Sequence, residues 1–183
     1  MVVLDSRPMS EFRSMNIPMG VDVPGAELVL RVHDIAPNPE TIVVVNCAGR
    51  TRSIIGCQSL KNAGIPNKVV ALENGTMGWH LAGLDLEYGN ERRYGELSAE
   101  GLKRAEASAV HVRERFGVQT IDKATLAKWC AENSRTTYIL DVRDPEEFNE
   151  AHIPNSRPAP GGQLVQATDR YVGTLGARIV CVD

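Results

Sequence analysis

The chain has 183 residues, of which 43% are hydrophobic and 23% charged, and its formal net charge is −3. These values fit one or two domains of a soluble globular protein, and so small a negative charge gives no reason to expect a nucleic acid or an anionic membrane as a partner. No apolar run approaches the roughly 20 residues of a membrane span, and the first residues, MVVLDSRP, lack the basic and apolar regions of a signal peptide.

Short apolar runs alternate with amphipathic segments through the first part of the chain. The apolar runs predict strands over residues 2–5, 41–46 and 68–72, and the other segments predict helices over residues 8–15, 25–36, 51–63 and 76–82. Pro37 and Pro39 separate the second helix from the strand after it, and Gly64 and Pro66 end the third helix. This alternation is typical of βαβ units, which build a mainly parallel sheet flanked by helices.

The stretch over residues 89–117 is different, because it is polar and highly charged. Residues 98–116 predict one helix, with Ser98 as its N-cap and Gly117 as the residue that ends it. The arginines of this helix are interleaved with glutamates, so we expect a solvated connector rather than a basic binding patch. A further helix is predicted over residues 122–134, capped by Asp122, and it leads into a strand over residues 136–141.

Two stretches of the chain repeat each other. Residues 4–18, LDSRPMSEFRSMNIP, align without a gap to residues 140–154, LDVRDPEEFNEAHIP, at a constant offset of 136. The sequence therefore predicts two copies of one module. We expect a domain over residues 1–90 with a truncated start, a helical linker over 91–117, and an incomplete second domain over 118–183, together forming a fragment of a longer repeat protein.

A cysteine lies between a predicted strand and a predicted helix, in the segment VVVNCAGRTRSIIG over residues 43–56. Such a junction leaves backbone N–H groups free, and the helix N-terminus adds a partial positive charge. Arg50 and Arg52 add two full charges beside Cys47. This place favours an anion, and therefore the thiolate, which is the nucleophilic form of cysteine.

The other residues of this loop suit the same chemistry. Gly49 permits a tight turn and a close backbone approach, and Thr51 and Ser53 can cap the helix and offer their hydroxyl groups. The remaining cysteines lack this context, and we expect Cys57 and Cys181 to be buried and inert. No Cys/His spacing matches a metal site and no disulfide framework is apparent, so we expect a reducing, cytoplasmic compartment.

Five short motifs characterise the first copy: the D-x-R strand end at Asp5 and Arg7, the E-F pair of the next helix, the I-P turn, the CAGRTRS loop, and the NGTMGW stretch from Asn74 to Trp79. With these motifs the sequence resembles the rhodanese-like family of sulfurtransferases. The resemblance implies three-layer α/β domains in tandem, each with a mainly parallel β-sheet flanked by helices. It also implies further rhodanese domains in the full-length chain.

The resemblance assigns a role to each residue of the loop. It implies that Cys47 is the nucleophile and carries sulfur as a persulfide. The substrate-binding loop would consist of Ala48, Gly49, Arg50, Thr51, Arg52 and Ser53, with the backbone amides around the persulfide and both arginines on the anionic part of a donor such as thiosulfate. A thiophilic acceptor, a thiol or cyanide, would then remove the sulfur. Neither a metal nor an organic cofactor is implied.

Two alternatives to a sulfurtransferase remain open. Cysteine phosphatases of related fold use H-C-x5-R, whereas Asn46 precedes the cysteine here and Arg52 is the fifth residue after it. The spacing therefore favours sulfur transfer over a phosphatase or an arsenate reductase. The other alternative is a non-catalytic module that binds a partner or carries sulfur without turnover.

The second copy is expected to be catalytically silent. At the offset of 136, Cys47 falls on Asp183, and a slip of one place puts Asp183 opposite Asn46. In both alignments this chain supplies no nucleophile to the second copy. Because the D-x-R motif recurs in the copy without the cysteine, we interpret Asp5 and Arg7 as a structural ion pair rather than as catalytic groups.

Overall fold

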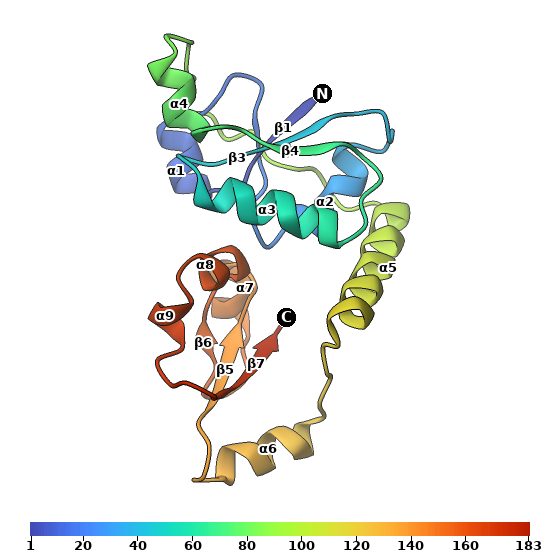
Figure 1. The fold of residues 1–183 in the computed structure, drawn as a ribbon, viewed down its shortest axis with the longest axis vertical. Coiled ribbons are helices and arrows are strands. Elements are labelled where there is room, and N and C mark those ends of the chain that lie inside the picture. Colours follow the sequence, from blue (N-terminus) through green and yellow to red (C-terminus); the bar gives the residue numbers. More distant parts are fainter. The chain divides into compact units, whose positions relative to one another are not determined.

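In the computed structural model, which describes residues 1–183, the chain divides into two units, Met1–Gly117 and Val118–Asp183. Each unit is an α/β unit with parallel strands and flanking helices, which confirms the predicted fold class (Figure 1). No helix combines the length and the apolar character that crossing a bilayer requires.

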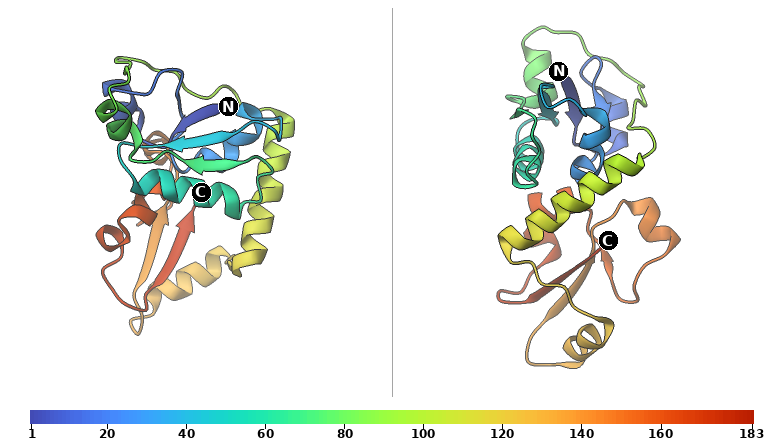
Figure 2. Two further views of the ribbon diagram at one scale, coloured as in Figure 1. Left: turned by 45° about the horizontal axis from the view of Figure 1, so that its top comes forward. Right: turned by 90° about the vertical axis from the view of Figure 1, so that its right-hand side faces the viewer.

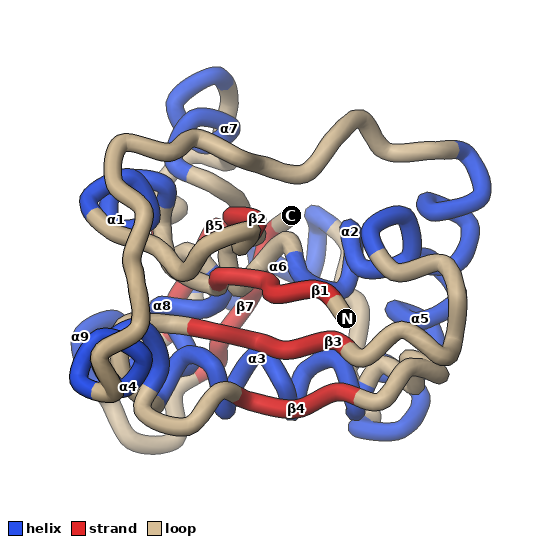
Figure 3. The backbone as a smooth tube through the Cα atoms, turned by 90° about the horizontal axis from the view of Figure 1, so that it is seen from above, coloured by secondary structure: helices blue, strands red, loops and turns tan.

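The first unit is built on a sheet of four parallel strands in the order β2-β1-β3-β4. The strands are β1 (Val2–Asp5), β2 (Val21–Asp22), β3 (Val43–Asn46) and β4 (Val69–Ala71). The helices are α1 (Met9–Ser14), α2 (Leu28–Ile35), α3 (Thr51–Asn62), α4 (Gly75–Leu81) and α5 (Ala99–Phe116). Strands β1, β3 and β4 lie side by side when viewed from above (Figure 3). The sequence did not predict β2, because two residues are too few to show a pattern.

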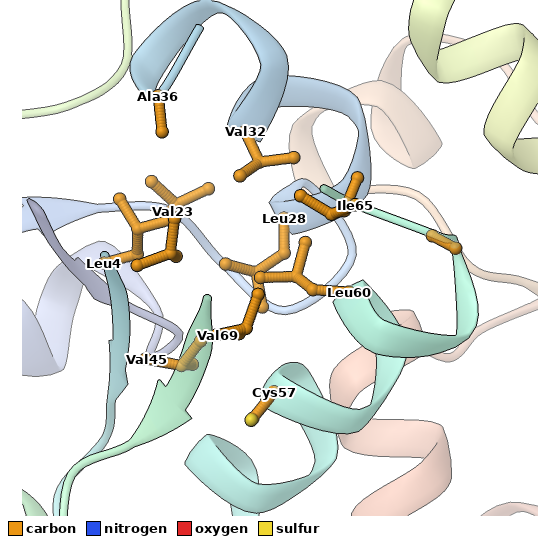
Figure 4. Close-up of a cluster of buried hydrophobic side chains, with 12 residues drawn as sticks. Leu4, Val23, Leu28, Val32, Ala36, Val45, Cys57, Leu60, Ile65 and Val69 are labelled. Atoms are coloured by element: carbon orange, nitrogen blue, oxygen red, sulfur yellow. The ribbon is translucent and has the colours of Figure 1, made fainter. Parts of the chain in front are cut away.

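The core of the first unit lies between the sheet and helices α2 and α3 (Figure 4). Side chains alternate along a strand, so Leu4, Val43 and Val45 face this core. Leu28 from α2 and Leu60 from α3 are fully buried against them. The same alternation directs Asp5 and Asn46, the last residues of β1 and β3, to the opposite face of the sheet. The cysteine-bearing loop follows Asn46 directly.

Helix α5 packs against α2 and so belongs to the first unit (Figure 2). Ser98 caps α5 as predicted, with its Oγ accepting a bond of 2.9 Å from the Gly101 N–H. The carboxylate of Asp34, in α2, accepts bonds from both the N–H and the hydroxyl of Ser98. A side chain at position 101 would meet that carboxylate at 2.4 Å. The segment predicted to be a linker is therefore held by side-chain and backbone bonds to α2.

The second unit has a sheet of three parallel strands in the order β6-β5-β7. Its strands are β5 (Thr137–Asp141), β6 (Arg157–Pro158) and β7 (Arg178–Val182). Its helices are α6 (Lys123–Ala131), α7 (Pro145–Glu150), α8 (Gly161–Gln166) and α9 (Thr168–Tyr171). The buried apolar cluster of this unit is small and centres on Leu140, Ala159 and Leu164.

The strand registers of the two units confirm the internal repeat. In the first unit Asp5 pairs with Asp22 on one side and with Asn46 on the other. In the second unit Asp141 pairs with Pro158 and Val182, each 136 positions later. The repeat therefore runs without a slip, and Val182 is the counterpart of Asn46.

Burial was predicted for two further cysteines, and the structure confirms it for one of them only. Cys57 is buried as predicted, at 6% exposure. Cys181 is exposed, which contradicts the prediction that it faces a core. Its counterpart at the offset of 136 is Val45, which lies against α3 and is fully buried. No helix follows β7 in these 183 residues, so the equivalent face of β7 is uncovered.

Candidate active site

The predicted nucleophile is buried at the carboxyl end of β3. Cys47 is 2% exposed and lies between β3 and α3. Its thiol donates to the hydroxyl of Ser53 across 3.5 Å. The Ser53 hydroxyl in turn donates to the Arg50 carbonyl at 2.9 Å. Ser53 thus connects the sulfur to the backbone of the loop that surrounds it.

The loop after the cysteine presents a row of unpaired backbone donors. Six successive N–H groups, from residue 48 to residue 53, donate to no acceptor in the protein. The first helical bond of α3 runs from the N–H of Ile54 to the carbonyl of Arg50, at 3.2 Å. Helix starts leave such groups free, and the preceding loop adds more of them. The groups belong to Ala48, Gly49, Arg50, Thr51, Arg52 and Ser53.

Helix α4 fixes the direction of the first two of these donors. The N–H of Thr76 donates to the Cys47 carbonyl at 2.8 Å, and the N–H of Met77 donates to the Ala48 carbonyl at 2.9 Å. Every peptide bond in the chain is trans, so the carbonyl and the N–H of one peptide unit point in opposite directions. The N–H groups of Ala48 and Gly49 therefore point away from α4.

The close backbone approach in the site occurs at Gly75, not at Gly49. Gly75 has a φ of +56°, and a Cβ there would lie 2.2 Å from the Cys47 carbonyl oxygen. A Cβ at Gly49 would meet nothing within 4 Å, and Gly49 has no positive φ. Within the protein, neither a positive φ nor a close neighbour of its own Cβ therefore requires a glycine at 49, although its backbone N and O lie within 3 Å of a Cβ at Gly75. The loop is shaped by contact with α4, which local sequence around the cysteine does not reveal.

A buried polar network joins β1, β3 and α4 beneath the cysteine. The Asn46 side chain donates from Nδ2 to Asp5 Oδ2 and to Thr76 Oγ1, both at 2.9 Å. Thr76 Oγ1 donates to the Cys47 carbonyl at 3.2 Å. Arg7 binds both carboxylate oxygens of Asp5 at 2.8 Å, which confirms the predicted ion pair. The network links this pair to the backbone of the cysteine.

The two arginines of the loop have different environments. Arg50 is exposed, and its side chain makes no hydrogen bond or ion pair. Arg52 binds Glu11 through two bonds of 2.6 and 2.7 Å. These hydrogen bonds lower the pKa of the Glu11 carboxyl and raise the pKa of the Arg52 guanidinium. Arg50 is therefore the loop cation without a counter-charge.

The start of α3 also differs from the prediction. The N-cap residue is Arg50, and no side chain caps the helix. Thr51 is the first helical residue and is exposed, and the Ser53 hydroxyl bonds to a carbonyl rather than to an N–H group. The prediction that Thr51 and Ser53 cap the helix is therefore wrong. The absence of a cap is what leaves the N–H groups of the loop available.

Comparisons with known proteins show which family the chain resembles in sequence and fold. The family profile of the rhodanese-like domain matches residues 1–82 and 122–183. A crystal structure of a thiosulfate sulfurtransferase from Pseudomonas aeruginosa is 58% identical, with a TM-score of 0.94, and the match covers 100% of this chain and 35% of that one. The chain thus spans about a third of the length of that protein. A search of curated proteins found no significant match.

Two further solved structures match the chain at lower identity. A Rhodanese_3-like domain from an Anabaena protein is 23% identical, with a TM-score of 0.44, and the match covers 49% of this chain and 94% of that one. A 3-mercaptopyruvate sulfotransferase from Escherichia coli is 17% identical, with a TM-score of 0.37, over 98% of this chain and 80% of that one.

Proposed function

Because the chain belongs to the rhodanese-like domain family, we propose that it is a sulfurtransferase. In this proposal Cys47 carries sulfane sulfur from an anionic donor such as thiosulfate to a thiol or cyanide acceptor. The observation that carries the proposal is the row of six unpaired N–H groups that directly follows the buried thiol. Fixed donors of this kind stabilise negative charge on a neighbouring sulfur.

Sulfur transfer takes place in two steps. The Cys47 thiolate attacks the outer sulfur of thiosulfate, a new S–S bond forms at Cys47, and the S–S bond of the donor breaks. The electron pair of the broken bond leaves with sulfite. The persulfide bears its negative charge on the outer sulfur, beside the amides of the loop. Cyanide or a thiol then attacks that sulfur, and the Cys47 thiolate is restored.

In this proposal the side chains of the loop have different roles. Arg50 has no counter-charge, so it is the group that binds the anionic part of the donor. The Ser53 hydroxyl lies 3.5 Å from the sulfur and can turn from the Arg50 carbonyl to donate to the thiolate. Arg52 was also predicted to bind the donor, but its ion pair with Glu11 favours a role in holding α3 against α1.

A phosphatase reaction has less support than sulfur transfer. In the H-C-x5-R signature the arginine binds the phosphate, whereas Arg52 lies one place too early and is paired with Glu11. The second unit has Val182 and Asp183 where the first has Asn46 and Cys47, so we propose that it is catalytically silent. It supplies a scaffold or a surface for a partner.

The proposal requires a reduced thiol. All four cysteines are unpaired, which suits the reducing, cytoplasmic compartment that the sequence suggests. Small sulfur compounds are the substrates in this proposal, and further rhodanese domains of the full-length protein are its covalent neighbours.

The test is sulfur transfer from thiosulfate to cyanide by the wild type and by Cys47→Ser. We expect turnover by the wild type and an adduct of about 32 Da, the mass of one sulfur atom, on the intact protein. Both should vanish in Cys47→Ser and persist in the control Cys57→Ser. An adduct without turnover would indicate a sulfur carrier, and neither adduct nor turnover would overturn the proposal in favour of a binding module.

A further inference from the structure

We infer that Glu11 is a specificity-determining residue that leaves the site with one uncompensated cation and thereby lowers its preference for doubly charged over singly charged sulfur donors. This inference rests on the proposed sulfurtransferase activity. Glu11 lies in α1 and is 41 residues from Arg52 in the sequence, yet both of its carboxylate oxygens bind that guanidinium. The pair is a bidentate fork, the strongest geometry for a carboxylate and an arginine.

Arg52 is largely buried, whereas its partner Glu11 is partly exposed to solvent. The Arg52 side chain is 14% exposed and the Glu11 side chain 41% exposed. Arg52 is close enough to Cys47 and Asp5 for their charges to interact. The carboxylate of Glu11 therefore cancels a positive charge that would otherwise act directly on the cysteine and its substrate.

The charges around the cysteine can be counted in pairs. Arg7 is matched by Asp5, in a fork that is almost completely buried. Arg52 is matched by Glu11. Arg50 alone is exposed and has no partner. With Arg52 neutralised, the loop attracts a dianionic donor less strongly than it would with two uncompensated arginines.

The second unit has the same residue at the position that matches Glu11. The counterpart of Glu11 at the offset of 136 is Glu147, at the same position in α7. Glu147 accepts a bond from the N–H of Asp144 and forms a capping box at the start of its own helix. Glu147 thus bonds to the start of its own helix, whereas Glu11 binds the loop arginine Arg52.

The prediction concerns two donors that undergo the same chemistry. Thiosulfate carries two negative charges and releases sulfite with two, whereas benzenethiosulfonate carries one and releases benzenesulfinate with one. In both cases the Cys47 thiolate takes the outer sulfur, one S–S bond breaks and another forms. The leaving group takes the electron pair, so charge balances and no further reactant is needed.

The test compares the kcat/KM values of these donors for the wild type and Glu11→Gln. Glutamine keeps an oxygen that can bind Arg52 but removes the charge. Because a dianion feels an added unit charge twice as strongly, we expect kcat/KM to rise about threefold for benzenethiosulfonate and about tenfold for thiosulfate. The preference for thiosulfate should then increase about threefold, and less at high salt.

Two further variants make the outcome decisive. Glu11→Asp keeps the charge and should retain the preference of the wild type. Glu147→Gln removes the same charge from the matched position of the second unit and should not change the preference. An unchanged preference in folded Glu11→Gln, or an equal change in Glu147→Gln, would overturn the inference. Failure of the wild type to form a Cys47 persulfide with either donor would overturn the proposed function instead.

Discussion

The two units contain the same aspartate–arginine ion pair but differ in the strand beside it. Both contain a carboxylate and an arginine at a D-x-R strand end, and the bonds of the two forks match closely. Arg7 binds Asp5 at 2.8 Å and donates to the Met15 carbonyl at 2.7 Å. Arg143 binds Asp141 at 2.7 and 3.0 Å and donates to the Ala151 carbonyl at 2.7 Å. This bidentate aspartate–arginine pair, the fork, is therefore common to both units. The sequences of the two units differ at the end of the neighbouring strand.

The difference lies in the strand beside the fork. In the first unit that strand ends in Asn46, which bonds to Asp5 and Thr76 and precedes Cys47 and its loop. In the second unit Val182 stands at the same register position and cannot form such bonds. The comparison teaches that the fork is common to both units, whereas the candidate active site also needs Asn46, Cys47 and the segments that pack around them in the first unit.

The largest effect is expected from breaking the fork in each unit. The Arg7 side chain is 2% exposed and that of Arg143 26% exposed. Arg7→Met leaves a buried carboxylate without its partner, so we expect a loss of about 3–5 kcal/mol from the unfolding free energy of the first unit. For Arg143→Met we expect a smaller loss, because the Arg143 side chain is itself partly exposed.

Urea denaturation measures both losses separately. Trp79 reports on the first unit and Trp129 on the second, so each variant is studied with the other tryptophan replaced by phenylalanine. Equal losses in the two units would contradict the importance of burial at the first fork.

The next effect concerns Gly75, the glycine that approaches the cysteine backbone in the first unit. Gly75→Ala places a Cβ 2.2 Å from the Cys47 carbonyl oxygen at a positive φ. We expect a loss of about 2–4 kcal/mol in stability and a fall of about 100-fold in sulfur transfer, because the donor loop is displaced.

Gly49→Ala is the matched control for the stability of the fold. Its Cβ would enter open space, so the free energy of unfolding should change by less than about 1 kcal/mol. Urea denaturation and the persulfide mass assay provide the measurements. A stable, active Gly75→Ala would refute the role of this glycine.

A smaller effect is expected when the first unit is made to resemble the second. Asn46→Val copies the residue at position 182 and removes two hydrogen bonds, to Asp5 and to Thr76. We expect a loss of about 1–2 kcal/mol in stability and a fall of about tenfold in kcat, with little change in KM, because the Thr76 hydroxyl that bonds to the Cys47 carbonyl loses the Asn46 amide that orients it. Steady-state kinetics tests this, and Val44→Ile in the same strand is the control. An unchanged kcat would show that Asn46 contributes to stability alone.

The smallest effect is a pH dependence of the second unit. The hydrogen bonds from Arg143 hold the pKa of Asp141 below its ordinary value of 3.8. The unfolded chain therefore binds the proton more readily, and the stabilisation is complete above that value and is lost as the pH falls through the folded pKa. Unfolding of the second unit, followed by Trp129 fluorescence between about pH 5 and pH 2, should show this loss. In Asp141→Asn, the unfolding free energy should depend less steeply on pH in this range. The same pH dependence in the variant and the wild type would contradict the prediction.

Local pattern was sufficient to predict much of this protein. The apolar runs and the amphipathic segments between them predicted β1, β3, β4 and α1 to α4 within a few residues, because side-chain periodicity is set by the local backbone. The caps Ser98 and Asp122 were predicted for the same reason, since each bonds within its own first turn. Comparison of the chain with itself predicted the repeat and the two forks.

Contacts between distant segments could not be predicted in this way. The pairing of Arg52 with Glu11, the approach of Gly75 to the Cys47 carbonyl, and the bond from Asn46 to Thr76 each join residues about 30 or 40 positions apart. Such contacts depend on how strands and helices pack, and periodicity within one segment carries no information about them. The exposure of Cys181 has the same cause, because burial of a strand residue is decided by the element that covers it.

The residue types and their spacing thus identified the family and predicted the nucleophile and the loop that holds it. The fold decided which arginine is free, which glycine approaches the cysteine backbone and which polar side chains anchor the loop. The physical reason is that the reactivity of a thiol depends on the donors and charges within a few ångström of it. In this protein they come from β1, α1, β3, α3 and α4, which only packing brings together.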